Sequence, residues 1–209
     1  LQKTDRADSR KLARALRNQE FASIHIPDRK LEADRALVRQ RFKLVKDLSR
    51  TKNRIKSLLF QFGITLPERL TADQMRHWSK PYITWLKELS VEEASLRETL
   101  DNYISMGEMQ RKQLLQVNRQ IRKLAWADAY RDNCNLLLNV PGIGLITAMT
   151  FLVQIGDITR FNRLDKLCNY VGLVPSMHGS GEKMDTGELI KRGRKELKIM
   201  LIEAAWVAV

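Results

Sequence analysis

The stretch VRQRFKLVKDLSRTKNRIKSLLFQF, residues 38–62, decides the main architecture of this chain. Apolar side chains recur in it at the alternating three- and four-residue spacing of a seam along one side of a long helix. The spacing therefore predicts one continuous helix, which ends at Gly63 with Pro67 just beyond it. The two rows of the seam are Val38, Val45 and Leu59, and Leu48, Ile55 and Phe62.

A second long helix with a seam of its own is predicted further along the chain. Ser90 and Glu93 have the spacing of a capping box at its start, and Gly107 and Gln110 interrupt its seam. The interruption is consistent with a bend or with a pin that sets the helix register. A compact segment containing Trp78 and Trp85 joins the two helices, so we expect a coiled-coil helical arm over residues 28–130. The second seam consists of Leu96, Leu100, Tyr103, Leu114, Val117, Ile121 and Leu124.

Two arrangements of this arm are open from the sequence. The helices either fold back on each other as an antiparallel pair or form one half of an intermolecular bundle. We interpret the arm as a spacer that also supplies a dimer contact. Its outer face carries eight basic residues against Asp47 alone, which makes a nucleic-acid track an alternative to an ordinary solvated surface. These residues are Arg39, Arg41, Lys43, Lys46, Arg50, Lys52, Arg54 and Lys56.

The whole chain is strongly basic. In 209 residues, 37 Lys and Arg stand against 24 Asp and Glu, a formal net charge of +13, and such a field attracts polyanions, most commonly nucleic acid. A hydrophobic content of 44% is enough for a packed core, which excludes a disordered tail. No apolar run approaches the roughly 20 residues that span a bilayer, and no signal-peptide pattern is present. We therefore expect a cytoplasmic protein without a membrane partner.

The cysteines and histidines do not indicate a zinc site. Cys134 and Cys168 lie 34 positions apart without a CxxC motif, and His25, His77 and His178 are scattered along the chain. We expect both thiols to be reduced and to serve as small buried hydrophobic groups.

Residues 1–27 combine a short basic helix with an extended segment. Asp5 and Asp8 are spaced i, i+3, so a helix that starts here places both carboxylates on one face. A pair of this kind is able to hold Mg²⁺, which prefers hard oxygen ligands. The spacing is weak evidence by itself, because Thr4 at an N-cap followed by acids in the first turn is also an ordinary helix start.

Residues 131–209 are expected to form a small helical domain with tight glycine turns. The first turn, Val140-Pro-Gly-Ile-Gly144, has the form of the hairpin in helix-hairpin-helix modules. Gly142 and Gly144 allow the backbone to point amide groups at a phosphate without reading base sequence. The alternative is an ordinary glycine turn between two packed helices.

A polar loop is expected at residues 172–187, before a last helix. Ser180 stands in it between Gly179 and Gly181, where the backbone is able to expose a hydroxyl. A serine attacks a phosphodiester only when its proton is removed and the phosphate charge is offset. His178 is a candidate base, although a Ser-Gly pair in a polar loop is by itself more often a simple turn. The candidate phosphate-binding residues nearby are Lys183, Lys191, Arg192, Arg194 and Lys195.

These features follow one another in an order that resembles a known family. The stretch KTDRADSRKLA, residues 3–13, precedes the long arm. The arm is followed by Val140-Pro-Gly-Ile-Gly144, Arg160-Phe161, Gly172-Leu-Val-Pro-Ser176, Ser180-Gly181 and Ile190-Lys-Arg-Gly193. Together they resemble the DEDD transposases of IS110-type insertion sequences over the whole chain, most specifically in its C-terminal part.

The resemblance implies a mostly α fold in three parts. Residues 1–27 would be the end of a RuvC-like nuclease domain, residues 28–130 the coiled-coil arm, and residues 131–209 the C-terminal transposase domain. Asp5 and Asp8 match the last two acids of a Mg²⁺-binding tetrad, and Ser180 matches the catalytic serine. The first two acids would lie upstream of Leu1, so we expect a fragment, truncated also at its C-terminal end and inactive by itself.

The implied function is DNA transposition and recombination by a prokaryotic, nucleoid-associated enzyme. With Mg²⁺ at the acidic site, Ser180 would attack a DNA phosphate, and strand exchange would follow. The implied partners are double-stranded DNA, a structured guide RNA and further copies of the chain in a dimer or tetramer. The alternatives are a non-catalytic module that binds nucleic acid and oligomerises through the hairpin and the arm, and a purely structural coiled-coil adaptor.

Overall fold

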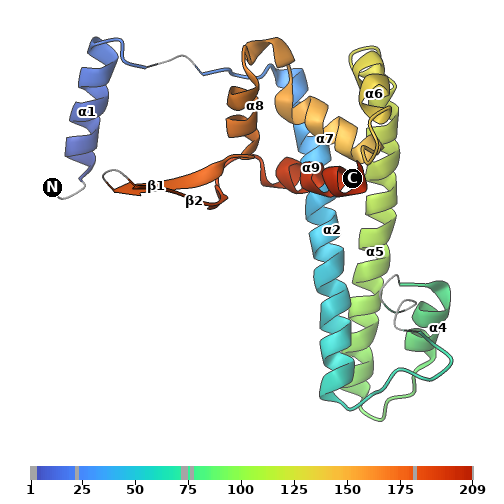
Figure 1. The fold of residues 1–209 in the computed structure, drawn as a ribbon. Coiled ribbons are helices and arrows are strands. Elements are labelled where there is room, and N and C mark those ends of the chain that lie inside the picture. Colours follow the sequence, from blue (N-terminus) through green and yellow to red (C-terminus); the bar gives the residue numbers. More distant parts are fainter. Residues whose placement is uncertain (1–3, 22–23, 72–74, 76–77, 181–182, 209) are drawn as a thin grey trace.

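The computed structural model describes residues 4–21, 24–71, 75, 78–180 and 183–208, and at 178–180 and 183–185 it describes the backbone alone. The described chain is mostly helical, which confirms the expected fold class, and it adds one two-stranded sheet (Figure 1). The elements in chain order are α1 (Asp5–Arg17), α2 (Arg29–Gln61), α4 (Lys80–Glu88), α5 (Ala94–Ala125), α6 (Arg131–Leu138), α7 (Leu145–Ile155), η1 (Ile158–Arg160), α8 (Leu164–Val171), β1 (Pro175–Ser180), β2 (Lys183–Leu189) and α9 (Lys195–Ala208).

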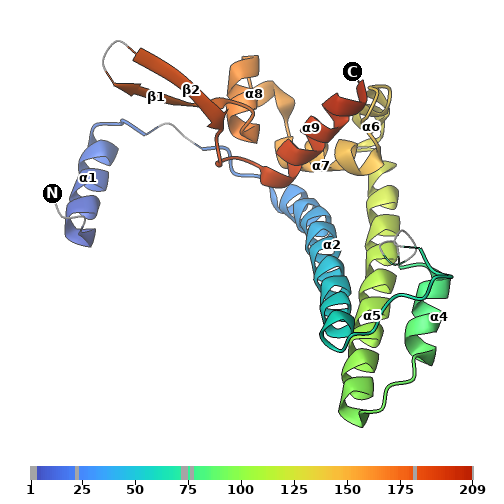
Figure 2. The ribbon, with the colours of Figure 1, turned by 60° about the horizontal axis from the view of Figure 1, so that its bottom comes forward.

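Helix α1 stands apart from the long helices in both views (Figures 1 and 2). Thr4 is its N-cap, and the Thr4 side chain accepts a hydrogen bond from the amide of Ala7 at 3.3 Å. None of its described residues is buried, and Leu12 and Leu16 are 59% and 70% exposed. The expected helix start is confirmed, and the apolar strip of α1 lies outside the cores formed by the described residues.

Helices α2 and α5 lie side by side and run antiparallel (Figures 1 and 2). Val38 and Ile55 from α2 and Ile121 from α5 are fully buried, as their places in the two apolar seams predict. Helix α2 ends at Gln61, and Gly63 follows with a positive φ of 64°, close to the expected end. The arm is therefore an antiparallel pair within one chain.

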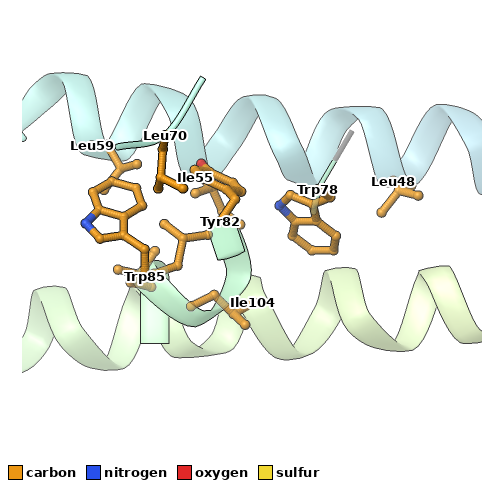
Figure 3. Packing of buried hydrophobic residues seen from close by; sticks show 10 residues of the cluster. Leu48, Ile55, Leu59, Leu70, Trp78, Tyr82, Trp85 and Ile104 are labelled. Carbon is orange, nitrogen blue, oxygen red and sulfur yellow. The ribbon is translucent and has the colours of Figure 1, made fainter. Parts of the chain in front are cut away.

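The segment that joins the two long helices adds a second layer to the far end of the arm. Trp78, Tyr82 and Trp85 pack with Ile55 and Ile104 in one buried cluster (Figure 3). This apolar contact covers seam residues that a bare two-helix arm would leave facing water. The far end of the arm is thus a small core of its own.

Gly107, which interrupts the second seam, makes room for the Trp78 indole; its role is in packing and not in bending the helix. A Cβ at this position would lie 1.7 Å from Cη2 of Trp78. Gln110, the other interrupting residue, accepts a hydrogen bond from Oγ1 of Thr51 on α2 at 2.9 Å. The seam is broken because an inserted ring and a polar cross-helix contact replace two aliphatic side chains.

The C-terminal helices pack on the opposite end of the arm from α4 (Figure 1). Cys134, Met149 and Val153 share one buried cluster with Val38 and Ile121 of the arm. Cys134 is fully buried, as expected of a small hydrophobic group, and this burial raises the pKa of its thiol. Cys168 is also free but only half-buried.

A buried arginine reinforces this junction. Arg35 of α2 is 3% exposed, and it donates hydrogen bonds from Nε to the carbonyl of Val153 at 2.6 Å and from Nη2 to that of Gln154 at 3.0 Å. These carbonyls lie in the last turn of α7, which has no further helical amide to pair with them. A cation at a helix C-terminus also complements the helix dipole. The arm and the C-terminal helices therefore share a core and a buried polar contact.

Two expectations about local structure are wrong. The region expected as a loop, residues 172–187, contains most of the antiparallel hairpin β1–β2, with Met177 opposite Thr186. Backbone pairing forms these strands although glycines and polar residues give them no clear alternation. The capping box is also wrong, because α5 begins at Ala94 and Glu93 makes no side-chain cap hydrogen bond.

Across the described parts of the chain, no helix is both long and apolar enough to cross a bilayer.

Candidate nucleic-acid and serine site

Ser180 is the last residue of β1, and its backbone pairs with that of Lys183 across the hairpin turn. The side chains of both residues, and that of His178, lie outside the described ones. Figures 1 and 2 show the hairpin extending away from α8 and the arm, with Ser180 at its far end. The backbone thus places the candidate nucleophile at the end of a projecting element.

Two glycines hold the base of this hairpin. Gly172 ends α8 with a φ of 91°, and a Cβ there would lie 2.3 Å from the carbonyl oxygen of Arg192. Gly193 has a φ of 99°, and its Cβ would lie 2.5 Å from the carbonyl oxygen of Val171. Only glycine tolerates both the positive φ and the close backbone approach. The glycines of the Gly-Leu-Val-Pro and Lys-Arg-Gly motifs therefore form the joint on which the hairpin stands.

This joint brings Arg194 to α8. The Arg194 amide donates a hydrogen bond to the carbonyl of Val171 at 3.1 Å, and its Nη2 donates one to Oη of Tyr170 at 2.9 Å. The Tyr170 hydroxyl in turn donates to the carbonyl of Gln154 at 3.0 Å. Arg194, an expected phosphate-binding residue, is thus half-buried and held by Tyr170.

Tyr170 was not expected from the sequence to belong to the candidate site. Burial raises the pKa of its phenol, but the guanidinium groups of Arg160 and Arg194 outweigh burial and hold this pKa below the ordinary value. The one signal in the sequence was the Arg160-Phe161 pair, which contributed to the family resemblance without a role of its own. The structure places this pair beside Tyr170.

The glycine turn before α7 has two distinct parts. Gly142 has a φ of 81°, and a Cβ there would lie 2.3 Å from the carbonyl oxygen of Ala204 on α9, so its conformation serves helix packing. Gly144 is the exposed N-cap of α7, without a side-chain cap, and a Cβ there would meet nothing within 4 Å. The expectation that both glycines face a phosphate therefore has geometric support at Gly144, where a helix N-terminus meets solvent.

Some of the expected basic residues are exposed, and others are engaged with side chains of the same chain. Lys191, Arg192 and Lys195 are exposed near the base of the hairpin, as a phosphate-binding role requires. On the arm, several members of the expected basic track are engaged within the chain. Their partners are Glu32 for Arg39, Asn118 for Arg41, Glu196 for Lys46 and Asp47 for Arg50. Lys43, Arg54 and Lys56 are exposed along α2.

The acidic pair lies on α1, away from the serine. Asp5 is exposed and Asp8 half-buried, one helical turn apart in the first part of the helix. In Figure 2 the end of β1 that carries Ser180 is well separated from α1. Among the described residues, no group of three or more His, Cys, Asp or Glu side chains is placed to hold a metal ion. One chain therefore does not bring its two carboxylates to Ser180.

Comparisons with known proteins match both ends of the chain. Residues 134–209 match the model of the transposase IS116/IS110/IS902 family, and residues 1–64 match a second transposase model, that of the IS110-type DEDD transposases. A putative transposase, y4qE, of Sinorhizobium fredii is 29% identical over 98% of this chain and 47% of its own length.

Two further relatives are transposases for insertion sequence elements. The one for IS1533 of Leptospira borgpetersenii is 26% identical over 98% of this chain and 58% of its own length. The one for IS1111A of Coxiella burnetii is 26% identical over 97% and 54%. The chain thus spans about half the length of the curated relatives it matches.

Proposed function

Because this chain belongs to the IS110-type DEDD transposases, we propose that it forms the nucleic-acid-binding and nucleophile-bearing part of an enzyme that cuts and rejoins DNA. The observation that carries the proposal is the projecting hairpin, which ends on Ser180 and stands on a joint surrounded by exposed basic residues. A nucleophile at the end of such an element can reach a phosphate on a duplex that the body of the protein cannot enclose.

In the proposed reaction the Ser180 hydroxyl attacks a DNA phosphorus atom. The Oγ–P bond forms while the bond from phosphorus to one sugar oxygen breaks, leaving a phosphoserine–DNA intermediate and a free strand end. The serine proton passes to a base, for which His178 is the candidate, and the leaving oxygen takes up a proton. Lys191, Arg192 and Lys195 offset the phosphate charge, and attack by a strand hydroxyl on the phosphoserine reverses the bonds and rejoins DNA.

Asp5 and Asp8 are the proposed metal ligands of this chain. Two carboxylates one turn apart on an accessible helix face suit Mg²⁺, which accepts a few carboxylate oxygens and keeps several waters. The ion would polarise the scissile phosphate. We propose that the other two acids of the tetrad come from outside these 209 residues. The separation of α1 from the hairpin supports a site completed between copies of the chain, in a dimer or tetramer.

Duplex DNA is the proposed substrate, and a structured guide RNA is a second proposed partner. The net charge of +13 and the exposed Lys43, Arg54 and Lys56 on α2 support a backbone contact that does not depend on base sequence. The open N-terminus of α7 at Gly144 supports a further phosphate contact on the C-terminal domain.

The test is made on the full-length parent protein with its DNA and Mg²⁺. A denaturing gel after rapid quenching should show a covalent protein–DNA adduct in the wild type and none in Ser180→Ala. Ser176→Ala, a change of the same kind in the same strand, is the matched control and should retain the adduct. An adduct that persists in Ser180→Ala refutes the assignment of the nucleophile.

The open end of α7 also favours a second candidate function, a non-catalytic nucleic-acid-binding and oligomerisation module. The two functions differ in the adduct assay, since a binding module forms no adduct with any serine. For the 209-residue chain itself we expect binding of nucleic acid without strand transfer, because it carries two of the four acids. Strand transfer by this chain alone would contradict the proposal.

A further inference from the structure

Arg160, Tyr170 and Arg194 form a cluster at the base of the hairpin. The Cζ atom of Arg160 lies 4.5 Å from the centroid of the Tyr170 ring, and that of Arg194 lies 5.0 Å from it. Arg160 also lies 4.3 Å from the centroid of the Phe161 ring. Two guanidinium groups are thus held against one phenol, both within the range of a cation–π contact.

No carboxylate among the described residues forms an ion pair with either guanidinium group. Asp157 is close enough for the charge of Arg160 to contribute to lowering its pKa, but hydrogen bonds from Thr159 are the larger cause. The Asp157 carboxylate accepts these from the amide and the hydroxyl of Thr159 at 2.9 and 2.7 Å. Two like charges gathered on one ring, with no ion pair to a described carboxylate, favour the arrival of an anion.

The geometry shows which nitrogens are available to such an anion. Nε and Nη2 of Arg160 are buried without a hydrogen-bond partner, in the corner between the Phe161 and Tyr170 rings. Nη1 of Arg160 has no partner among the described residues and is not among the buried atoms, so it is the donor of this half-buried side chain that a ligand can reach. On Arg194, Nη2 is bonded to Tyr170, whereas Nε and Nη1 have no partner among the described residues and are not among the buried atoms that lack one. The rings therefore hold both groups and leave donors that have no partner among the described residues.

We propose that Arg160 and Arg194, held by Tyr170 and Phe161, are a subsite that binds a backbone phosphate of the nucleic acid on which the hairpin acts. Arginine presents a rigid fork of donors that suits phosphate oxygens, and stacking on aromatic rings reduces the side-chain entropy lost on binding. This inference rests on the proposed function, since it takes a phosphodiester as the ligand. DNA and RNA both offer that group.

The subsite positions the nucleic acid rather than taking part in bond cleavage. Ser180 lies five residues along β1 from Pro175 at the hairpin base, roughly 16 Å at about 3.3 Å per residue. That length corresponds to about five steps of a duplex at 3.4 Å each. The bound phosphate would therefore lie several nucleotides from the scissile one and set the register of the strand against the hairpin.

The test measures binding of the 209-residue chain to a fluorescent DNA duplex of about 20 base pairs and to an RNA duplex of the same sequence, between about 50 and 200 mM salt. Arg160→Gln should raise Kd about tenfold and reduce the slope of log K against log salt by about one, the signature of a lost phosphate contact. Arg160→Lys should not restore binding, since an ammonium group lacks the planar fork. A loss seen with only one of the two duplexes identifies which nucleic acid the subsite holds.

Arg163→Gln is the matched control. Arg163 is three residues away, exposed, and engaged with its neighbour Asp165 at 3.0 Å, so its removal should leave Kd and the slope nearly unchanged. Tyr170→Phe keeps the ring and removes the hydroxyl that holds Arg194, and it should weaken binding with little change in Tm. If Arg160→Gln and Tyr170→Phe keep the wild-type Kd and slope, the subsite is refuted while the proposed function stands. If the wild type binds neither duplex, the nucleic-acid-binding function itself fails.

Discussion

The phenols of Tyr82 and Tyr170 have opposite electrostatic surroundings. Tyr82 is packed in the arm, and burial raises its pKa to about 12 because the phenolate is poorly solvated there. Tyr170 is also partly buried, but the two adjacent guanidinium groups lower its pKa. The pKa of a tyrosine is therefore raised in the apolar core of the arm and lowered beside the two arginines of the C-terminal part.

The Tyr82 shift predicts a loss of stability at high pH. Its folded pKa of about 12 lies above the value of about 10 of an unfolded tyrosine, so the neutral form is favoured by folding. The resulting contribution to stability is complete below pH 10 and is lost as pH rises toward 12. In Tyr82→Phe, the free energy of unfolding in urea should fall less over this interval than in the wild type. Tyr103→Phe, on α5, is the control, and equal declines in Tyr82→Phe and the wild type would contradict the prediction.

Among the elements, α5 is shaped by the ring that it receives. Helix formers surround Gly107, and glycine in a helix interior costs about 1 kcal/mol relative to alanine. The absence of a side chain admits Trp78, which is 1% exposed and donates no hydrogen bond from its indole nitrogen to a described residue. Packing of the indole against both long helices offsets the weak helix propensity of this position.

Gly107→Ala should therefore destabilise the protein although alanine is the better helix former. The added methyl group would overlap the Trp78 ring, and the displaced ring should lower the free energy of unfolding by about 2 kcal/mol. Ser105→Ala changes an exposed position of the same helix and should alter stability by less than about 0.5 kcal/mol. Urea denaturation of the three proteins decides the point, and a Gly107→Ala variant as stable as Ser105→Ala would show that Trp78 is not seated there.

The elements differ in how far the sequence predicts them. The seams of α2 and α5 were predictable because buried aliphatic residues recur with the helical period. The hairpin was not, because β1 and β2 are short, contain Gly179 and Gly187, and depend on backbone pairing instead of a side-chain pattern. The roles of Gly107 and Gly142 were equally hidden, since their partners Trp78 and Ala204 come from distant parts of the chain.

The candidate site was predictable in part for the same reason. Local motifs identified Ser180 and the basic residues after it as candidates. The cluster of Arg160, Tyr170 and Arg194 depends on contacts between η1, α8 and the start of α9, which no spacing along the chain reveals. The acids on α1 and the serine hairpin are separate from each other in one chain (Figure 2), so their association stays a prediction.

In the whole molecule, α5 and α2 both contact α7, and the buried arginine of this junction lies on α2. This helix has 33 residues and is therefore about 50 Å long at 1.5 Å per residue. Only its first part contacts α7, where Arg35 holds the carbonyls of Val153 and Gln154. The junction between the arm and the C-terminal helices thus combines a shared apolar core with this buried arginine.

Arg35→Met should therefore lower the free energy of unfolding far more than Arg39→Met. Removing the guanidinium group leaves the buried carbonyl of Val153 without a donor and that of Gln154 with only the Tyr170 hydroxyl, so the free energy of unfolding should fall by about 3 kcal/mol. Arg39→Met, which removes the partly exposed pair with Glu32 one turn further along α2, should cost about 1 kcal/mol or less. Hydrogen exchange in α7 should accelerate in Arg35→Met alone, and equal effects of the two substitutions would contradict this account of the junction.

Ser180, at the end of β1, is the residue that we propose as the nucleophile of the DNA transposase. The most direct measurement is mass-spectrometric mapping of the peptide that remains linked to a nucleotide after the trapped adduct of the full-length protein is digested. We expect the linked residue to be Ser180. A nucleotide on any other residue, or a cleavage reaction that proceeds without a linked peptide, would contradict it.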